Sequence, residues 1–250
     1  MNISFHVIIS RVVEIHYTKQ AIKRGVYFMK FIDRVKAFAK KYSHAWVFLY
    51  TFIYMPWFCY LEEHIQKNYF IIHSPLDDFV PFIEYFIIPY YFWFLFMAIC
   101  VFYFFFTDKK GFYKISSFLI IGMTVFLIIC TVFPNGLNLR PTTFARDNFC
   151  VDLVKRLYRI DTPTNVLPSI HVFNTVAVLV AVTHSQKLRL HKGIMCGVYI
   201  TGILIILSTV FLKQHSVTDV IAAFAMAGII YPFVYTSQPR KATRFSHQPI

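Results

Sequence analysis

Residues 85–106 read YFIIPYYFWFLFMAICVFYFFF, a stretch of 22 residues without a charged side chain. A helix needs about 20 apolar residues to cross the hydrocarbon core of a bilayer, which is about 30 Å thick. The whole chain has this character, because 57% of its 250 residues are hydrophobic, 19% are aromatic and only 15% are charged. Such a composition is too apolar for a water-soluble domain. The sequence therefore predicts an all-α, polytopic membrane protein.

Six apolar segments are long enough to be predicted as membrane spans, which gives a six-transmembrane-helix bundle. They lie near residues 44–61, 79–107, 112–133, 168–185, 193–212 and 216–236. The single sizeable outer loop, 134–166, is rich in polar and turn-forming residues. The chain accordingly divides into a basic leader over 1–43, a six-span domain over 44–236 and a tail over 237–250.

The leader contains an N-terminal amphipathic segment. Residues 17–41 have the pattern of a basic amphipathic helix that would lie on the membrane surface. A solvated basic segment is the alternative interpretation. The sequence does not decide between Met1 and Met29 as the first translated residue.

Lys and Arg are distributed unevenly between the predicted loops. Nine lie in the first 43 residues, and three lie in each of the 108–114 turn, the 186–192 turn and the C-terminal tail. Because cytoplasmic flanks retain positive charge, both termini are predicted to be cytoplasmic in a multi-pass protein of the plasma membrane. Orientation and contact with anionic headgroups explain the net charge of +13, so no nucleic acid is expected as a partner.

Two short histidine motifs each begin a predicted span on the outer, extracytoplasmic face. They are Pro168-Ser169-Ile170-His171 and His215-Ser216-Val217-Thr218-Asp219. On a helix, the i, i+4 spacing lets the Asp219 carboxylate accept the His215 imidazole N–H and leaves the other ring nitrogen free to attack phosphorus. His171 could then protonate the departing alcohol and later activate water. These roles predict a phosphohistidine intermediate with His215, His171 and Asp219 as catalytic residues.

Phosphoryl transfer also needs positive charge or N–H donors for the phosphoryl oxygens. The outer side offers Arg140, Lys213 and the helix start at Ser169 as phosphate-binding groups. Each residue taken alone has a simpler alternative. Arg140 could be an interfacial side chain that reaches toward water, Ser169 an N-cap, and His171 a helix-start histidine.

Acidic side chains lie near the outer starts of two predicted spans. Asp219 lies inside the beginning of a span, where a carboxylate is costly unless it is paired or functional, and Glu84 raises the same question more weakly. His73 and Asp77 also have the His-x-x-x-Asp spacing, but Pro75 lies between them. That pair is interpreted as a coincidence.

The sequence predicts no cofactor and no metal site. The five cysteines show no Cys-x-x-Cys spacing, and neither a glycine-rich nucleotide loop nor a Gly-x-Ser-x-Gly motif is present. The sequence does not indicate an oligomeric state.

Two additional segments complete a set of motifs. Arg140 is followed by Pro141, and Ser208 precedes the second histidine motif. Together with the histidine motifs they resemble, in order, the three motifs of the type 2 phosphatidic acid phosphatase superfamily, whose pattern is Lys-x6-Arg-Pro, Pro-Ser-Gly-His and Ser-Arg-x5-His-x3-Asp. The resemblance implies metal-independent chemistry in which His215 is the nucleophile, Asp219 orients it and His171 is the acid and base. It also implies that Arg140 and Ser169 bind phosphate.

Three positions depart from that pattern. Phe133 stands where the first motif has Lys, Ile170 replaces Gly, and Thr209 replaces Arg. The phosphate cradle has therefore lost two cations, for which Lys213 could partly compensate. The third motif is more similar to the branch that contains inositol phosphorylceramide synthases and sphingomyelin synthases, and the 77–89 stretch resembles small bacterial members of that branch.

The sequence thus predicts a metal-independent lipid phosphatase that hydrolyses a lipid phosphate or diphosphate through a phosphohistidine at the outer membrane face. Its partners would be a phosphorylated membrane lipid and the bilayer itself. A phospho-headgroup transferase is the first alternative, because it shares the covalent intermediate and differs only in whether water or a lipid hydroxyl resolves it. A non-catalytic lipid-binding or carrier module is the second, against which the retained histidine pair argues.

Overall fold

The computed structural model describes residues 27, 29–65 and 67–236. The described residues fall into two compact units, with the boundary between Trp46 and Val47, and each unit is considered by itself. In the first unit, residues 29–41 are helical. Residues 17–26 and 28 of the predicted amphipathic segment lie outside the described residues, as does the tail over 237–250, so the amphipathic segment and the tail stay predictions.

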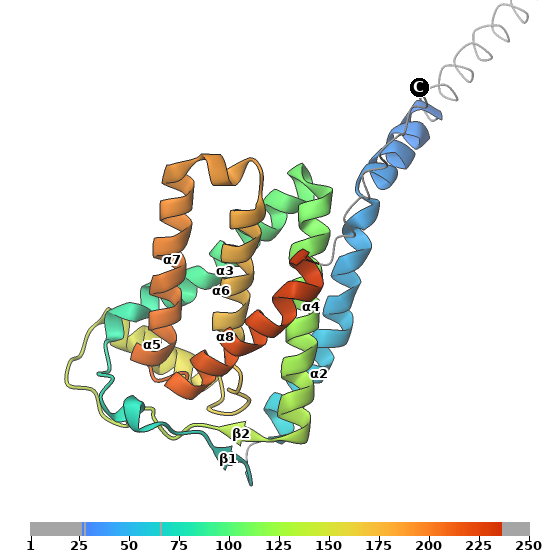
Figure 1. Ribbon diagram of the computed structural model, residues 1–250. Helices are drawn as coiled ribbons and strands as arrows, with labels where there is room; N and C mark the ends of the chain where they lie inside the picture. Colours follow the sequence, from blue (N-terminus) through green and yellow to red (C-terminus); the bar gives the residue numbers. More distant parts are fainter. Residues whose placement is uncertain (1–26, 28, 66, 237–250) are drawn as a thin grey trace, which may run out of the picture. The chain divides into compact units, whose positions relative to one another are not determined.

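The second unit is a bundle of helices (Figure 1). A 3-10 helix, η1 (Ser43–Tyr50), bridges the boundary and leads into the bundle, whose helices follow in chain order. They are α2 (Thr51–His64), α3 (Ile87–Thr107), α4 (Lys109–Val132), α5 (Phe149–Ile160), α6 (Ile170–His184), α7 (Lys192–Phe211) and α8 (Val217–Tyr231). The shorter elements are η2 (Pro75–Asp78), η3 (Glu84–Phe86), η4 (Leu188–Leu190), the π-helical turn η5 (Pro232–Thr236), and the strands β1 (Phe70–Ile71) and β2 (Asn135–Gly136).

Helix α6 is the centre of this bundle, since it packs against α3, α4, α7 and α8. The contact with α4 is close. The Phe118 and Phe173 rings are stacked with centroids 5.1 Å apart, and a Cβ atom at Gly122 would lie 2.0 Å from the Phe173 ring. A glycine is therefore required for α4 to approach α6 this closely. The central position of α6 matters because its first turn carries one of the two histidine motifs.

Four helical segments of the described chain are long and apolar enough to cross a membrane. They are Glu84–Thr107, Lys109–Val132, Lys192–Phe211 and Val217–Thr236. Helix α6 is apolar but has only 15 residues, or about 22 Å at 1.5 Å per residue. Helix α2 has 14 residues. The prediction of a mostly helical multi-pass chain is thus confirmed, whereas the count of six spans stays a prediction.

The segment between α4 and α6, which the sequence indicates as a polar outer loop, has structure of its own. Strand β2 pairs in parallel with β1. The Asn135 side chain accepts hydrogen bonds from the backbone N–H groups of Val166 (2.9 Å) and Leu167 (2.8 Å). Helix α5 begins at the N-cap Asn148 and buries Val154 and Leu157 against α3. These contacts fix the chain immediately before the first histidine motif.

Candidate active site

His215 and Asp219 meet at the beginning of α8. Nδ1 of His215 lies 3.4 Å from Oδ2 of Asp219, and both side chains are buried. The same carboxylate oxygen accepts the backbone N–H of Ser216 at 2.8 Å, while the Ser216 hydroxyl caps the first turn of the helix. His215 therefore precedes the helix, and the predicted contact arises because the capping box turns Asp219 back toward it.

Asp77 supports this helix start from a distant part of the chain. Its Oδ2 accepts the Ser216 hydroxyl at 2.6 Å, and its Oδ1 accepts the Val217 N–H at 2.8 Å. Asp77 is buried. A carboxylate is favourable here because the first N–H groups of a helix lack partners within the helix. His73 pairs with the neighbouring Asp78 at 3.0 Å instead, so the His73–Asp77 spacing marks no pair, although Asp77 itself was missed.

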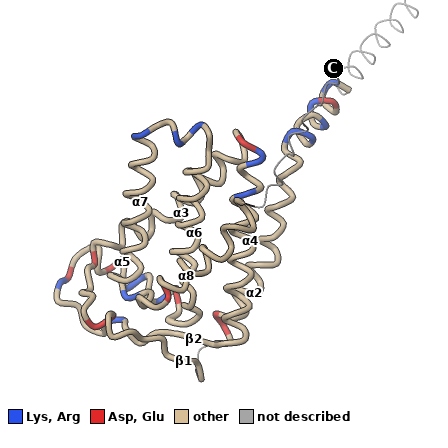
Figure 2. The backbone as a smooth tube through the Cα atoms, viewed as in Figure 1, with Lys and Arg blue, Asp and Glu red and all other residues tan. Residues whose placement is uncertain are grey.

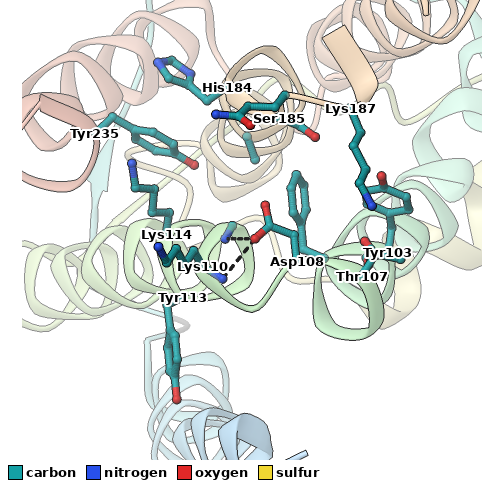
Figure 3. A pocket seen from close by; sticks show the side chains of 14 residues that line it. Tyr103, Thr107, Asp108, Lys110, Tyr113, Lys114, His184, Ser185, Lys187 and Tyr235 are labelled. Carbon is teal, nitrogen blue, oxygen red and sulfur yellow. Dashed lines mark hydrogen bonds between the residues drawn. The ribbon is translucent and has the colours of Figure 1, made fainter. Parts of the chain in front are cut away.

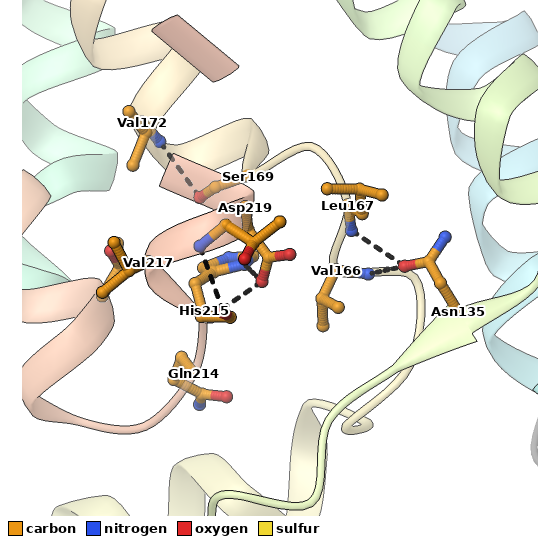
Figure 4. A network of polar contacts seen from close by, with 12 residues as sticks. Asn135, Val166, Leu167, Ser169, Val172, Gln214, His215, Val217 and Asp219 are labelled. Carbon is orange, nitrogen blue, oxygen red and sulfur yellow. Dashed lines mark hydrogen bonds and ion pairs between the residues drawn. The ribbon is translucent and has the colours of Figure 1, made fainter. Parts of the chain in front are cut away.

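The structure brings the two histidine motifs together (Figure 4). The ring centroids of His171 and His215 are 5.8 Å apart. Ser169 is the N-cap of α6, and its side chain accepts the Val172 N–H at 3.4 Å. Its own backbone N–H donates to the Asp219 carbonyl at 3.1 Å. This hydrogen bond links the start of α6, which carries His171, to the first turn of α8, which directly follows His215.

Two aromatic side chains of α3 hold the His171 ring. Tyr90 is stacked on it with a centroid distance of 4.8 Å, and Trp93 lies at 4.4 Å. The Tyr90 hydroxyl also donates to Oδ2 of Asp161 at 3.4 Å. Burial raises the pKa of the Asp161 carboxyl, while Arg140 and His215 counteract part of that rise. Sequence reasoning missed both aromatic contacts of His171, because no local spacing relates α3 to α6.

Arg140 points inward, toward the end of α5. Its guanidinium donates to the carbonyls of Asp161 (2.7 Å) and Thr162 (3.0 Å), and also to the side-chain oxygen of Gln214. It lies 4.7 Å from the centroid of the Tyr158 ring. Burial lowers the pKa of the guanidinium, and the charge of Asp161 opposes this shift. Arg140 thus adjoins the residue before His215, and its role as a phosphate ligand stays a prediction.

Lys213 has a left-handed backbone, with φ of 51°, and its ammonium group binds the η2 region. Nζ donates to the carbonyls of Asp77 (2.8 Å) and Val80 (2.5 Å). Burial lowers the pKa of Lys213, against the opposing charges of Asp77 and Asp78. The ammonium group of Lys213 thus binds the carbonyls of the 77–80 segment. The sequence had suggested that Lys213 binds phosphate in place of the missing cations, and that role stays a prediction.

The three residues that depart from the family pattern each pack against, or donate a hydrogen bond to, neighbouring residues. Phe133 packs on Phe70, with ring centroids 5.3 Å apart. Thr209 is buried, its hydroxyl donates to the Ile206 carbonyl at 2.7 Å, and its own carbonyl accepts the N–H groups of residues 214 and 215. Ile170 packs with the apolar cluster between α2 and α4. Neither of the two missing cations is replaced at its own position.

Four buried polar atoms, in the two histidine motifs, in Gln214 and in Arg140, have no hydrogen-bond partner among the described residues. They are Nε of Arg140, Nδ1 of His171, Nε2 of Gln214 and Oδ1 of Asp219. Buried polar groups are nearly always hydrogen-bonded, so such atoms in a native protein point to a ligand or water. Three of the four can donate a proton, which suits a phosphoryl group.

Two other features of the described chain bear on the site. Glu84 accepts hydrogen bonds from Arg146 (3.0 Å) and Asn148 (3.1 Å) and joins η3 to the start of α5. It therefore has structural partners, as a carboxylate at a span edge requires. No group of three or more His, Cys, Asp or Glu side chains suited to a metal ion occurs in the residues that the structure describes.

Comparison with known proteins identifies the region that carries this site. The family described as the PAP2 superfamily matches residues 115–243. That range begins within α4 and includes both histidine motifs, Arg140 and Ser208. No curated protein and no solved structure matches the chain.

Proposed function

The chain belongs to the PAP2 superfamily, and from this premise we propose that it is a membrane lipid phosphatase acting through a phosphohistidine. The observation that carries the proposal is the buried His215–Asp219 contact of 3.4 Å beside His171. Members of the superfamily are in general phosphatases and phosphotransferases, and neither activity is explained by a carrier that only binds lipid.

The chemistry proceeds in two displacements. Asp219 accepts a hydrogen bond from Nδ1–H of His215, which keeps the proton on Nδ1 and leaves the lone pair of Nε2 free to face the phosphorus atom. As the N–P bond forms, the P–O bond to the lipid breaks and a protonated His171 gives its proton to the leaving oxygen. His171 then removes a proton from water, whose oxygen attacks phosphorus, and the N–P bond breaks to release phosphate and free His215.

The phosphoryl oxygens require donors around this centre. Arg140 and the first turn of α6 at Ser169 remain our proposed ligands, and Gln214 joins them because its buried Nε2 has no partner among the described residues. The contacts of Lys213 with the carbonyls of Asp77 and Val80 support a role in positioning the loop before His215. We therefore place Lys213 among the supporting residues.

We further propose six membrane crossings, with both termini cytoplasmic and the histidine pair extracytoplasmic at the plasma membrane. The distribution of charge supports this orientation. The lysine-bearing turns between α3 and α4 and between α6 and α7 lie at the end of the bundle opposite β1 and β2 (Figures 1 and 2). Clusters of Lys and Arg of this kind favour the cytoplasmic side.

Headgroup transfer between lipids is the second candidate reaction. It is favoured by Phe133 and Thr209, which replace two cations of the phosphatase pattern with an apolar contact and a helix-internal hydrogen bond. A weaker phosphate cradle suits the inositol phosphorylceramide synthase-like and sphingomyelin synthase-like branch, in which a lipid hydroxyl takes the place of water. A non-catalytic lipid carrier is a third reading, which requires no role for the histidines.

The test is phosphate release by the detergent-purified full chain with EDTA present. Phosphatidic acid, phosphatidylglycerophosphate and polyprenyl diphosphate are offered, each with and without diacylglycerol or ceramide as acceptor. A phosphatase releases inorganic phosphate without an acceptor, and His215→Ala abolishes the release. His73→Ala removes an exposed histidine away from the site and serves as the matched control. A new phospholipid formed only with an acceptor would establish the transferase, and no product with any pair would overturn both reactions.

A further inference from the structure

A cavity with polar side chains in its wall lies at the end of the bundle opposite the histidine pair. It has a volume of about 790 Å³ and is formed by the C-terminal end of α3, the first turns of α4, the C-terminal end of α6 and η5. Helix α6 connects the two regions, because His171 lies in its first turn and His184 ends it. Thirteen residues of α-helix span about 20 Å. The cavity is therefore separate from the proposed phosphatase site.

Positive charge dominates the wall of this cavity. Lys110 and Lys114 come from α4, and Lys187 comes from the turn after α6 (Figure 3). Asp108 is the single acidic residue of the wall in the described chain, and its Oδ1 is occupied as the N-cap of α4 by the N–H groups of residues 110 and 111. Three cations against one capping carboxylate suit an anionic ligand.

An unpartnered hydroxyl points into the same space. Tyr235 is 8% exposed, and its hydroxyl has no hydrogen-bond partner among the described residues. Figure 3 shows this hydroxyl directed between Lys114 and Asp108. The Lys114 ammonium lies 5.5 Å from the centroid of the Tyr235 ring, so the ring holds a cation beside a free donor. A buried tyrosine normally finds a partner for its hydroxyl.

The position of the cavity decides the class of ligand. It opens at the ends of α3 and α4, both long and apolar enough to cross a membrane, and aromatic side chains such as Tyr103 line its wall. Lysines and tyrosines at the end of a membrane helix meet lipid headgroups. We propose that this cavity binds the phosphate group of an anionic phospholipid from the leaflet at that end of the bundle.

The test measures lipid binding by the purified full chain in detergent. The His215→Ala protein is used so that no lipid is hydrolysed. Short-chain phosphatidylglycerol, phosphatidylcholine and inorganic phosphate are titrated separately, and each arm is followed by the shift in Tm and by the mass of the intact complex. Phosphatidylglycerol should bind with one lipid per chain and raise Tm, whereas phosphatidylcholine and inorganic phosphate should do so weakly.

Substitutions locate the binding. Lys110→Gln, Lys114→Gln and Lys187→Gln combined should weaken phosphatidylglycerol binding by about a hundredfold, since each lysine near a headgroup contributes about fivefold. Tyr235→Phe should weaken it several-fold while leaving the ring in place. The control combines three exposed cations of α5, changed to Gln at Lys155, Arg156 and Arg159, and should bind like the parent. Equal losses in both triple variants, or tight binding of inorganic phosphate alone, would overturn the proposal.

Discussion

The hydroxyl of Ser216 donates to the carboxylate of Asp77 over 2.6 Å, although the two residues are 139 positions apart in the chain. Asp77 thereby holds the N-cap of α8 in the same turn in which Asp219 reaches His215. Two carboxylates therefore fix the start of α8: Asp77 belongs to η2, and Asp219 belongs to the first turn of α8 itself. Asp77 is a positioning residue, because its carboxylate binds Ser216 and Val217, the two residues after His215, and not the imidazole.

We predict that Asp77→Asn lowers both stability and phosphate release. The substitution keeps the shape but weakens the hydrogen bonds to Ser216 and Val217, which is worth about 1–3 kcal/mol for a buried charged acceptor. Thermal unfolding and kcat/KM of the purified protein measure the two effects. The matched control is Asp78→Asn, since that neighbouring carboxylate is exposed and pairs with His73. Equal behaviour of the two variants would remove the positioning role.

Asp219→Asn should reduce phosphate release by about 10²–10⁴ while the protein still folds. An amide cannot accept the imidazole proton as a carboxylate does, so His215 loses its preferred tautomer and its basicity. Rapid acid-free quenching with ³²P-labelled substrate measures the labelled histidine directly. The wild-type chain should show label that is absent in His215→Ala and reduced in Asp219→Asn. Full labelling of the Asp219 variant would contradict the orienting role.

Lys213→Asn should lower Tm and leave KM for the lipid phosphate nearly unchanged. Asparagine tolerates the left-handed backbone at this position, so the substitution removes the ammonium group without strain. The lost contacts are those to the carbonyls of Asp77 and Val80. Arg140→Gln serves for comparison and should raise KM, because that guanidinium adjoins Gln214. A large rise in KM for the Lys213 variant would instead return this residue to the phosphate cradle.

The raised pKa of Asp161 leads us to predict that the stability of the protein depends on pH. Burial raises the pKa of this carboxyl above its ordinary value of 3.8, so the folded state binds the proton more tightly than the unfolded state. The stability gained from this tighter proton binding is fully present below the pKa of Asp161 in the unfolded state. It is lost as the pH rises through the pKa of Asp161 in the folded state. The Tm of the wild-type chain relative to Asp161→Asn should therefore fall as pH rises from about 4 toward neutrality. A difference in Tm that stays constant over this range would contradict the raised pKa.

The sequence predicted that His171, His215 and Asp219 lie close together, because their positions depend on two helix starts and one i, i+4 spacing. It could not predict that Tyr90, Trp93 and Asp77 lie beside them, because those positions depend on how distant segments pack. The same holds for Arg140, since only the folded chain shows that carbonyls at the end of α5 take its protons.

Helix α5, in contrast, could have been predicted, because its amphipathic pattern and its N-cap are visible in the sequence. Buried residues recur there at Cys150, Val151, Val154 and Leu157, which is the helical period, after an Asn148 N-cap. Expecting one continuous polar loop hid this pattern. The six spans were predicted from the lengths of the apolar segments alone. Those lengths do not show that α6 begins after the N-cap Ser169, ends at His184 and so has only 15 residues.

The shortness of α6 has a consequence for the surrounding bilayer. Its length of about 22 Å falls roughly 8 Å short of a hydrocarbon core of about 30 Å. Its neighbours α3, α4 and α7 have 20 to 24 residues and are long enough to cross, so at least one end of α6 lies below the plane of the headgroups. His171 at one end and His184 at the other therefore do not both lie at the level of the headgroups. Bilayer thickness thereby becomes a variable that sets how deep a lipid phosphate must descend to reach the histidine pair.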